Sequence, residues 1–412
     1  MDQRADRLGN DLNSGQTPPP NAGPATPMRI LFFTTKLNLK NAGGSVPDLD
    51  LKVRDLIALG HDVSVVTVFS RGNDLSTPPP YPIIEERIPT DSLFTTQPAF
   101  RRLLQAYEGK ADVFHVEGQF LYGAGLYRLL GGRTPIVAFF NRELVSWPNE
   151  PYVTQTLKSR CRFLLEKHVG TKIANRIDAF VITSPYLRDA LRAFGLRDRP
   201  TLVLPDFVNA KDIRRIAGTD ATPSRTDGGI CTLMCTGRMI PEKGFDAVLN
   251  AFALLERKER FRLIMGGNGP EEGRLRALSA KLGLDPYVTF TGWIEKDQML
   301  RHLADADIFI LPKWRIELTS VILFEAMSLG KPSIVMAGGG LEWLVGDAGL
   351  AFPMDDVRAL ADRIMRLADD RALQTTCGEN AMKRMQQEFD HATMAKRMEE
   401  LVRQTAEKTK NA

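Results

Sequence analysis

The sequence predicts an α/β protein of two domains, each built on a doubly wound parallel sheet. Its 412 residues, 43% of them apolar and 25% charged, are enough for two globular cores. Short apolar runs alternate with amphipathic stretches, first in residues 28–216 and again in residues 230–388, as in parallel strands joined by helices. The polar, turn-rich segment 217–229 lies between the two series, and it is interpreted as a linker.

The first domain begins after a segment that we expect to be a disordered tail. Residues 1–27 contain five prolines and almost no large apolar side chains, so burial could not offset the entropy lost on ordering. Arg29–Thr35 is then a largely apolar run of the length that a buried parallel strand needs. The loop after it contains Gly43 and Gly44. These glycines allow backbone N–H groups to approach a phosphate closely, although a plain flexible turn explains them equally well.

The same alternation continues through both domains. In the first domain, helical patterns separate most of the further strands predicted at 62–69, 112–116, 135–140, 178–184 and 201–204. In the second, strands are expected near Thr232, Phe261, Val288, Asp307 and Pro332. Doubly wound sheets bind ligands at the carboxyl ends of their strands. The last segment, 389–412, is predicted to be a helix long enough to cross back to the first domain.

Charge and cysteine content exclude several classes of protein. The 54 basic and 50 acidic side chains leave a net charge of only +4, which does not indicate a nucleic-acid-binding protein. Four cysteines are too few for a disulfide scaffold, and they fit a reduced, cytoplasmic environment. No apolar run approaches the roughly 20 residues that span a bilayer, and the start of the chain has no basic-then-apolar signal.

One basic segment leaves a membrane contact open. From Lys158 to Arg176 a helical pattern interleaves basic side chains with Phe163, Leu164 and Val169. Such a helix can lie on an anionic membrane, whereas a solvated face on a core-packed helix is the simpler interpretation. We therefore expect a cytoplasmic protein, at most peripheral at the cytoplasmic face of the membrane.

Two cations follow the first strand of the second domain. Gly237 and Arg238 come directly after that strand, and Lys243 with Gly244 precedes a helix. Both cations therefore face the carboxyl edge of the sheet beside the positive end of a helix dipole, an arrangement that favours a diphosphate. If the reaction breaks a bond to that diphosphate, they oppose the negative charge that grows on the leaving group. An ordinary surface Arg and Lys near a turn would show the same spacing.

Two acidic residues, Glu317 and Glu325, lie eight positions apart. Glu317 is in the loop after the buried strand near Asp307, and Glu325 is one to two turns into the helix that begins near Ser320. They can therefore face different parts of one elongated ligand, and carboxylates form strong hydrogen bonds with sugar hydroxyls. The N–H groups of Ser320 and Val321 at the helix start offer a second cradle for phosphate.

The remaining polar positions are less informative. The turn Gly266–Pro270, with Gly269 just before a helix, suits close backbone approach to a ligand but lacks the full dinucleotide spacing. None of the histidines has metal-ligand spacing, and His115, which lies near a strand end, is expected to be structural. Neither a metal site nor a cofactor is predicted.

These motifs resemble those of the retaining family 4 glycosyltransferases, which have the two-domain GT-B fold. The pair of cations matches the family's G-R-x4-K-G element, the two glutamates match its E-x7-E motif, and the glycine pair matches its first glycine loop. The resemblance covers nearly everything from Met28 to about Gln404. It implies two Rossmann-like domains that face each other across a cleft.

The resemblance also implies a reaction and roles for particular residues. A sugar would move from a nucleoside-diphosphate donor to an acceptor hydroxyl on a saccharide, a lipid-linked saccharide or a small molecule, with retention at the anomeric carbon. Arg238 and Lys243 would bind the diphosphate, Glu317 the donor sugar and Glu325 the ribose, and Trp293 would lie near the base. Usually no metal is needed in such enzymes, because side chains and helix ends neutralise the diphosphate. A dedicated covalent nucleophile is generally not found, and the favoured mechanism is front-side attack in which the leaving phosphate oxygen takes the acceptor's proton.

Three departures from the family pattern affect the site. The family often has Gly-Phe-Gly after the first glutamate, where this chain has Leu318, Thr319 and Ser320, which would tighten or redirect the sugar pocket. A family histidine after one strand of the first domain is here Asn141, and another, beyond the glycine pair, is Asp48. Two alternatives stay open: a sugar-nucleotide epimerase of similar build, and a protein that binds the donor without turning it over.

Overall fold

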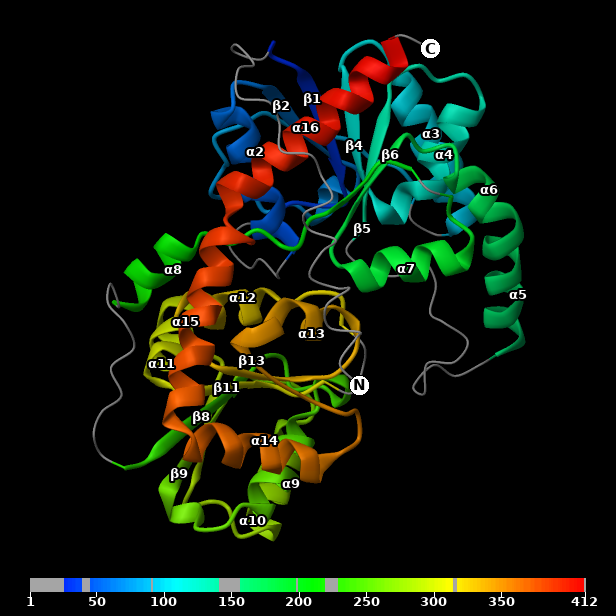
Figure 1. Cartoon of the computed structure of the whole chain (residues 1–412). Helices are drawn as coiled ribbons and strands as arrows, with labels where there is room; N and C mark the ends of the chain where they lie inside the picture. The colour runs from blue at the N-terminus through cyan, green and yellow to red at the C-terminus, as the bar shows by residue number, and fades with distance from the viewer. Residues whose placement is uncertain are drawn as a thin grey trace.

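The computed structural model describes residues 26–38, 45–89, 92–140, 156–197, 199–218, 229–313 and 317–410. They form two parallel β-sheets, each flanked by helices (Figure 1). We call the unit around the first sheet the first lobe and the unit around the second sheet the second lobe. Most of the predicted tail and linker lie outside the described residues, as do Gly43, Gly44 and Asn141.

The first sheet has the strand order β3-β2-β1-β4-β5-β6-β7, and all neighbouring strands are parallel. Its strands are β1 Arg29–Thr34, β2 Asp62–Thr67, β3 Ile83–Glu85, β4 Val113–Glu117, β5 Ile136–Phe140, β6 Ala179–Ile182 and β7 Thr201–Val203. The helices of this lobe are α2 Ser45–Ala58, α3 Leu93–Ala106, α4 Leu121–Leu129, α5 Leu157–Leu165, α6 Thr171–Ala174 and α7 Pro185–Phe194. The next helix, α8 Ala210–Ala217, packs on the second lobe, where its Ile213 is buried in the same apolar cluster as Phe309. The central strands are apolar and buried on both faces, as a parallel sheet between helices requires.

The second sheet has the order β10-β9-β8-β11-β12-β13 and is also parallel throughout. Its strands are β8 Cys231–Thr236, β9 Phe261–Gly266, β10 Val288–Gly292, β11 Ile308–Leu311, β12 Ser333–Met336 and β13 Gly349–Phe352. The helices that follow the strands are α9 Phe245–Leu254, α10 Glu272–Lys281, α11 Lys296–Asp305, α12 Val321–Ser328, α13 Gly339–Val345, α14 Val357–Asp369, α15 Arg371–Gln387 and α16 His391–Lys410. The predicted pair of doubly wound sheets is therefore confirmed.

Two strands, β3 and β13, were not predicted. Both lie at the edge of a sheet, where one neighbour is missing. Their residues are mostly only half-buried, and both strands are short, with three residues in β3 and four in β13. The hydrophobic pattern therefore locates the middle of each sheet better than its edges.

The last helix crosses from the second lobe to the first, as predicted (Figure 1). Met394, Met398 and Val402 on α16 are buried in the same apolar cluster as Val53 and Leu56 of α2. At the start of α16, His391 Nδ1 lies 2.8 Å from a carboxylate oxygen of Asp55, and this hydrogen bond raises the pKa of His391. Side chains of α16 thus form part of the apolar core of the first lobe.

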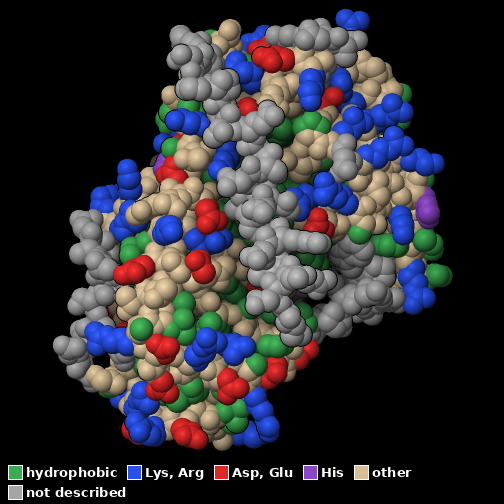
Figure 2. All heavy atoms as spheres, viewed as in Figure 1, with side chains coloured by type: hydrophobic (Ala, Val, Ile, Leu, Met, Phe, Trp, Pro, Cys, Tyr) green, Lys and Arg blue, Asp and Glu red, His purple; other side chains and the backbone are tan. Residues whose placement is uncertain are grey.

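The segment from α5 through the π-helical turn η4 Glu166–Gly170 to α6 lies on the periphery of the first lobe (Figure 1). Figure 2 shows Lys and Arg side chains along this flank. Several large apolar side chains on it are exposed, among them Leu157 at 80%, Leu164 at 54% and Val169 at 49%. Within the described part of the chain, no helix combines the length and the apolar character needed to cross a membrane.

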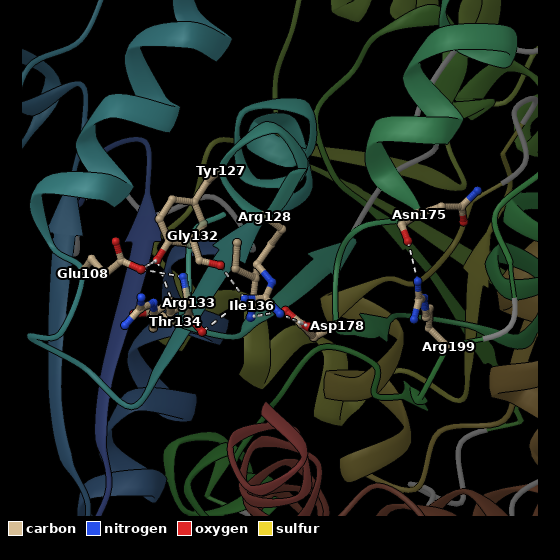
Figure 3. Close-up of polar contacts among 10 residues, drawn as sticks. All are labelled: Glu108, Tyr127, Arg128, Gly132, Arg133, Thr134, Ile136, Asn175, Asp178 and Arg199. Atoms are coloured by element: carbon tan, nitrogen blue, oxygen red, sulfur yellow. Dashed lines mark hydrogen bonds and ion pairs between the residues drawn. The ribbon is translucent and has the colours of Figure 1, made fainter. Parts of the chain in front are cut away.

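Buried and half-buried hydrogen bonds fix the amino ends of two strands of the first sheet (Figure 3). Asp178, just before β6, accepts hydrogen bonds from Arg128 Nη2 at 2.8 Å and from the backbone N–H of Ile136 at 2.9 Å. On the neighbouring loop, Glu108 accepts from the Tyr127 hydroxyl at 3.0 Å. These contacts hold the amino ends of β5 and β6. Ligands of such sheets bind at the opposite, carboxyl edge.

The carboxyl ends of strands from both sheets meet at the junction between the lobes. Ser184, just after β6, caps α7 by accepting a hydrogen bond from the N–H of Leu187 at 3.3 Å. A Cβ added to Gly340 on α13 would lie 2.9 Å from the Cβ of Ser184, so the starts of α7 and α13 are in close contact. Functional residues of the two lobes can therefore face each other here.

Candidate active site

The segment after β8 brings two cations to the carboxyl edge of the second sheet. β8 ends at Thr236, and Arg238 follows it as an exposed side chain. The 3-10 turn Pro241–Lys243 then leads to Gly244, whose φ of 67° is in the left-handed region that glycine adopts most easily. α9 begins immediately afterwards, so Lys243 lies beside the amino end of a helix.

The glycine-rich turn after β9 packs against this segment. Met239 N donates to the carbonyl of Asn268 at 2.7 Å, and Glu271 N donates to the carbonyl of Met239 at 3.1 Å. A Cβ added to Gly269 would lie only 2.3 Å from the Met239 carbonyl oxygen. Close approach of the two loops therefore accounts for this glycine, and its contact with a substrate stays a prediction.

Glu317 lies in the middle of a group of cations. Its Oε1 is 3.3 Å from Lys243 Nζ, although the two residues are 74 positions apart in the sequence. Lys313 forms an ion pair with the same oxygen and is itself buried. Glu317 Oε2 is also buried, and it has no hydrogen-bond partner among the residues that the structure describes.

Lys313 was not among the residues predicted from the sequence. It comes two residues after the buried strand β11, at the carboxyl edge of the sheet where Arg238 and Lys243 were sought. Its position in the sequence was a usable signal, because a cation at the end of a central strand faces this edge. The site therefore contains one more lysine than predicted.

The electrostatics of this group favour an anion. Burial lowers the pKa of Lys243, and the nearby Arg238 cation lowers it further. Three cations and one carboxylate at the same edge leave an excess of positive charge, which a bound diphosphate would neutralise.

Glu325 and Trp293 lie further along the same edge. Glu325 on α12 is buried, and its Oε1 is 3.0 Å from Lys296 Nζ at the start of α11. Burial raises the pKa of Glu325, while Lys296 opposes that shift. Trp293 follows β10 and is 72% exposed. Their predicted contacts with ribose and base stay predictions.

The loop that carries Glu317 also contacts the first lobe. Thr319 donates its hydroxyl hydrogen to Asp206, a residue 113 positions away just after β7. Ser320 is the N-cap of α12 but makes no side-chain capping bond, and Val321 is the first residue of the helix. The helix end therefore points its first N–H groups toward this junction.

Asp48, the residue at a position where the family often has histidine, forms a buried ion pair. Its Oδ2 lies 2.6 Å from Lys52 Nζ, and its Oδ1 accepts from the N–H of Phe207 at 2.7 Å. Lys52 Nζ is also 3.9 Å from the centre of the Phe139 ring, a cation–π distance. Next to this pair, burial and the Lys52 cation lower the pKa of His115 to about 3, so His115 stays neutral and packs as a core residue.

No group of three His, Cys, Asp or Glu side chains with the arrangement of metal ligands occurs among the described residues. The groups that could hold a negatively charged ligand are the cations described above and the start of α12.

Comparison with solved structures identifies the fold as GT-B. Sucrose-phosphate synthase from Thermosynechococcus elongatus superposes with a TM-score of 0.70 at 23% identity, covering 91% of this chain and 98% of that one. Anabaena HepE, solved in complex with UDP and glucose, has a TM-score of 0.69 at 19% identity, covering 92% and 100%. These likenesses show that the two lobes together have the GT-B fold.

The chain belongs to the family 4 glycosyltransferases. The model for "Glycosyltransferase Family 4" matches residues 49–212, and the model for "Glycosyl transferases group 1" matches residues 224–384. A GDP-mannose-dependent monoacylated alpha-(1-6)-phosphatidylinositol monomannoside mannosyltransferase of Corynebacterium glutamicum is 26% identical over 65% of this chain and 69% of its own length. The lipopolysaccharide core biosynthesis glycosyltransferase LpsD of Rhizobium meliloti is 30% identical over 50% of this chain, and the match spans 57% of LpsD.

Proposed function

We propose that this protein transfers a sugar from a nucleoside diphosphate to an acceptor hydroxyl, with retention at the anomeric carbon and without a metal ion. The observation that carries the proposal is the environment of Glu317. One carboxylate oxygen is bound by Lys243 and Lys313, while the other is buried without a partner among the described residues. Such an oxygen favours a hydroxyl donor, and a sugar joined to a diphosphate at the adjacent cations would supply one.

The chemistry follows from the same arrangement. As the bond between the anomeric carbon and the diphosphate oxygen breaks, negative charge grows on the diphosphate, and Arg238 and Lys243 oppose it. The acceptor oxygen forms its new bond on the same face of the sugar, and its proton goes to the leaving phosphate oxygen. No side chain has to act as a nucleophile in this scheme.

The relatives suggest which substrates to try. The Corynebacterium glutamicum relative is described as GDP-mannose-dependent and acts on a phosphatidylinositol mannoside, and LpsD acts in lipopolysaccharide core synthesis. Anabaena HepE has been solved in complex with UDP-glucose. We therefore propose a saccharide or glycolipid acceptor, with GDP-mannose and UDP-glucose as the first donors to test.

Binding of a nucleoside diphosphate is the first expected result. GDP or UDP at 100 times its dissociation constant should stabilise the protein by about 2.7 kcal/mol, which a thermal-shift measurement detects. Arg238→Ala should weaken this effect, because Arg238 contacts the diphosphate in our proposal. Arg371→Ala, which removes an exposed cation at the start of α15, is the matched control and should leave it unchanged.

Product analysis then separates the candidate activities. Incubation of the bound donor with acceptor saccharides should give a glycoside whose anomeric configuration, measured by NMR, matches that of the donor. An isomerised donor in the absence of acceptor would instead identify an epimerase. Binding without any product from a broad acceptor panel would identify a non-catalytic protein.

We also propose that the flank formed by α5, η4 and α6 contacts the cytoplasmic face of a membrane. Exposed apolar side chains alternate there with the exposed basic residues Arg160, Arg162, Lys167 and Lys172. Vesicles that contain phosphatidylglycerol should bind the protein in a flotation assay, and Leu164→Gln should weaken that binding several-fold. Leu254→Gln, at an exposed leucine of α9 in the second lobe, is the control. Equal binding of both variants would contradict the proposal.

A further inference from the structure

We infer that Asp206 is a positioning residue for sugar transfer: through the hydroxyl of Thr319 it holds the loop 317–320, and with it Glu317, in place between the lobes. Asp206 follows β7 of the first lobe, whereas Thr319 lies between β11 and α12 of the second. The inference depends on the proposed function, in which Glu317 contacts the donor sugar.

The backbone of this loop is attached to the second lobe. Gly340 N on α13 donates to the carbonyl oxygen of Glu317 at 2.7 Å. A Cβ added to Gly340 would lie 1.7 Å from the carbonyl oxygen of Leu318, so only glycine allows this close approach. The backbone position of Glu317 is therefore set by α13.

The side chains of the next two residues are attached to the first lobe. Leu318 is only 8% exposed and belongs to the apolar cluster of the first sheet, together with Ile182 and Leu187. Thr319 donates its hydroxyl hydrogen to Asp206. Because consecutive residues are held by opposite lobes, separation of the lobes must break one of these attachments. The position of the Glu317 carboxylate is therefore coupled to the approach of the lobes.

Asp206 lies in a buried and negatively charged environment, in which its carboxylate needs a hydrogen-bond donor such as the Thr319 hydroxyl. Burial and the negative charge of Asp48 raise the pKa of Asp206 to about 6, while the hydrogen bond from Thr319 and the Lys52 cation oppose the shift. Both carboxylate oxygens of Asp48 already have partners, in Lys52 and in the N–H of Phe207. Within the part of the chain that the structure describes, the donor to Asp206 is the Thr319 hydroxyl, which comes from the opposite lobe.

A double-mutant cycle tests the inference. Thr319→Val removes the hydroxyl at nearly constant volume, and we expect kcat to fall at least about 10-fold while the affinity for the nucleoside diphosphate stays within about twofold. Thr319→Ser keeps a hydroxyl and should recover most of the lost rate. Asp206→Ala should slow the reaction as much as Thr319→Val, and the double variant should be no slower, because all three lose the same bond. The rates are those of GDP or UDP release from GDP-mannose or UDP-glucose in the presence of an acceptor saccharide, and calorimetry with GDP and UDP gives the affinities.

The outcomes separate this inference from the proposed function. Thr289→Val, at an exposed threonine of β10, is the matched control and should keep the wild-type rate. The inference would be overturned if the losses in rate of the two single variants add up in the double variant. It would also be overturned if Thr319→Val is slow while Asp206→Ala is fully active. In both cases Thr319 would act on the substrate directly. If the wild-type protein is active and Thr319→Val has the same rate, this inference is overturned, whereas the proposed function is not. A wild-type protein that neither binds GDP or UDP nor releases them would overturn the proposed function and this inference together.

Asp206→Ala removes a charge near the buried pair Asp48–Lys52, so its stability needs a separate measurement. Thermal melting of each variant shows whether a lower rate reflects loss of folded protein. If Asp206→Ala is unstable, the comparison of Thr319→Val with Thr319→Ser decides the question. Equal rates for those two variants would overturn the inference.

Discussion

Replacing Glu317 by alanine is expected to lower kcat for sugar transfer by about 100- to 1000-fold, the range found when a group that stabilises a transition state is removed. The carboxylate is placed to contact the sugar rather than the diphosphate, so the affinity for GDP or UDP should change little. Steady-state release of the nucleoside diphosphate from GDP-mannose or UDP-glucose in the presence of an acceptor saccharide, together with calorimetry, measures both quantities.

Two further variants complete this experiment. Lys243→Ala should lower both kcat and the affinity for the nucleoside diphosphate, because Lys243 is assigned to the diphosphate itself. Glu259→Ala removes an exposed carboxylate just before β9, at the opposite end of the sheet, and should behave like the wild type. If Glu317→Ala and Lys243→Ala both keep full turnover, the site assignment is wrong.

Replacing Asp48 by alanine is expected to lower the free energy of unfolding by about 3–5 kcal/mol. Asp48 and Lys52 are each only about 2% exposed, so removal of the carboxylate leaves the ammonium group of Lys52 buried without its counter-charge. The N–H of Phe207 would lose its acceptor as well. Urea denaturation followed by circular dichroism measures the effect.

Two further variants show whether the loss of unfolding free energy in Asp48→Ala comes from the unpaired charge of Lys52. Arg54→Ala breaks a pair on the same helix with the same spacing, but Arg54 is largely exposed, so the expected loss is at most about 1 kcal/mol. Replacing both Asp48 and Lys52 by leucine removes the two charges together, and this double variant should be more stable than Asp48→Ala. A double variant that is less stable than Asp48→Ala would contradict this explanation.

The sequence predicted the sheets and the edge at which the site lies, because both follow from local patterns. Buried parallel strands are continuous apolar runs, and residues directly after such a run must lie at the carboxyl edge. Arg238, Lys243 and Glu317 were therefore expected at one edge, and the structure brings Lys243 and Glu317 into contact. The roles of these residues in catalysis stay predictions.

Other features depend on contacts that no local pattern contains. Lys52 occupies an ordinary polar position in a helical pattern, and only the packing of Phe139 and Phe207 around it shows that it is buried. The contact between Thr319 and Asp206 joins residues from different lobes, so it depends on how the two sheets face each other. The sequence indicated that the loop after Glu317 departs from the family pattern, but it did not indicate which partner the new side chains would find.

The crossing of α16 has a consequence for how the protein is made. Apolar side chains near the end of the chain fill a cluster whose other members lie within the first 210 residues or so, including Val53 and Phe207. During translation the amino-terminal half leaves the ribosome before α16 has been synthesised. The apolar surface that α16 later covers is therefore exposed during that time. Translation that stops before residue 391 should therefore leave an aggregation-prone product, even though every strand of both sheets has been synthesised.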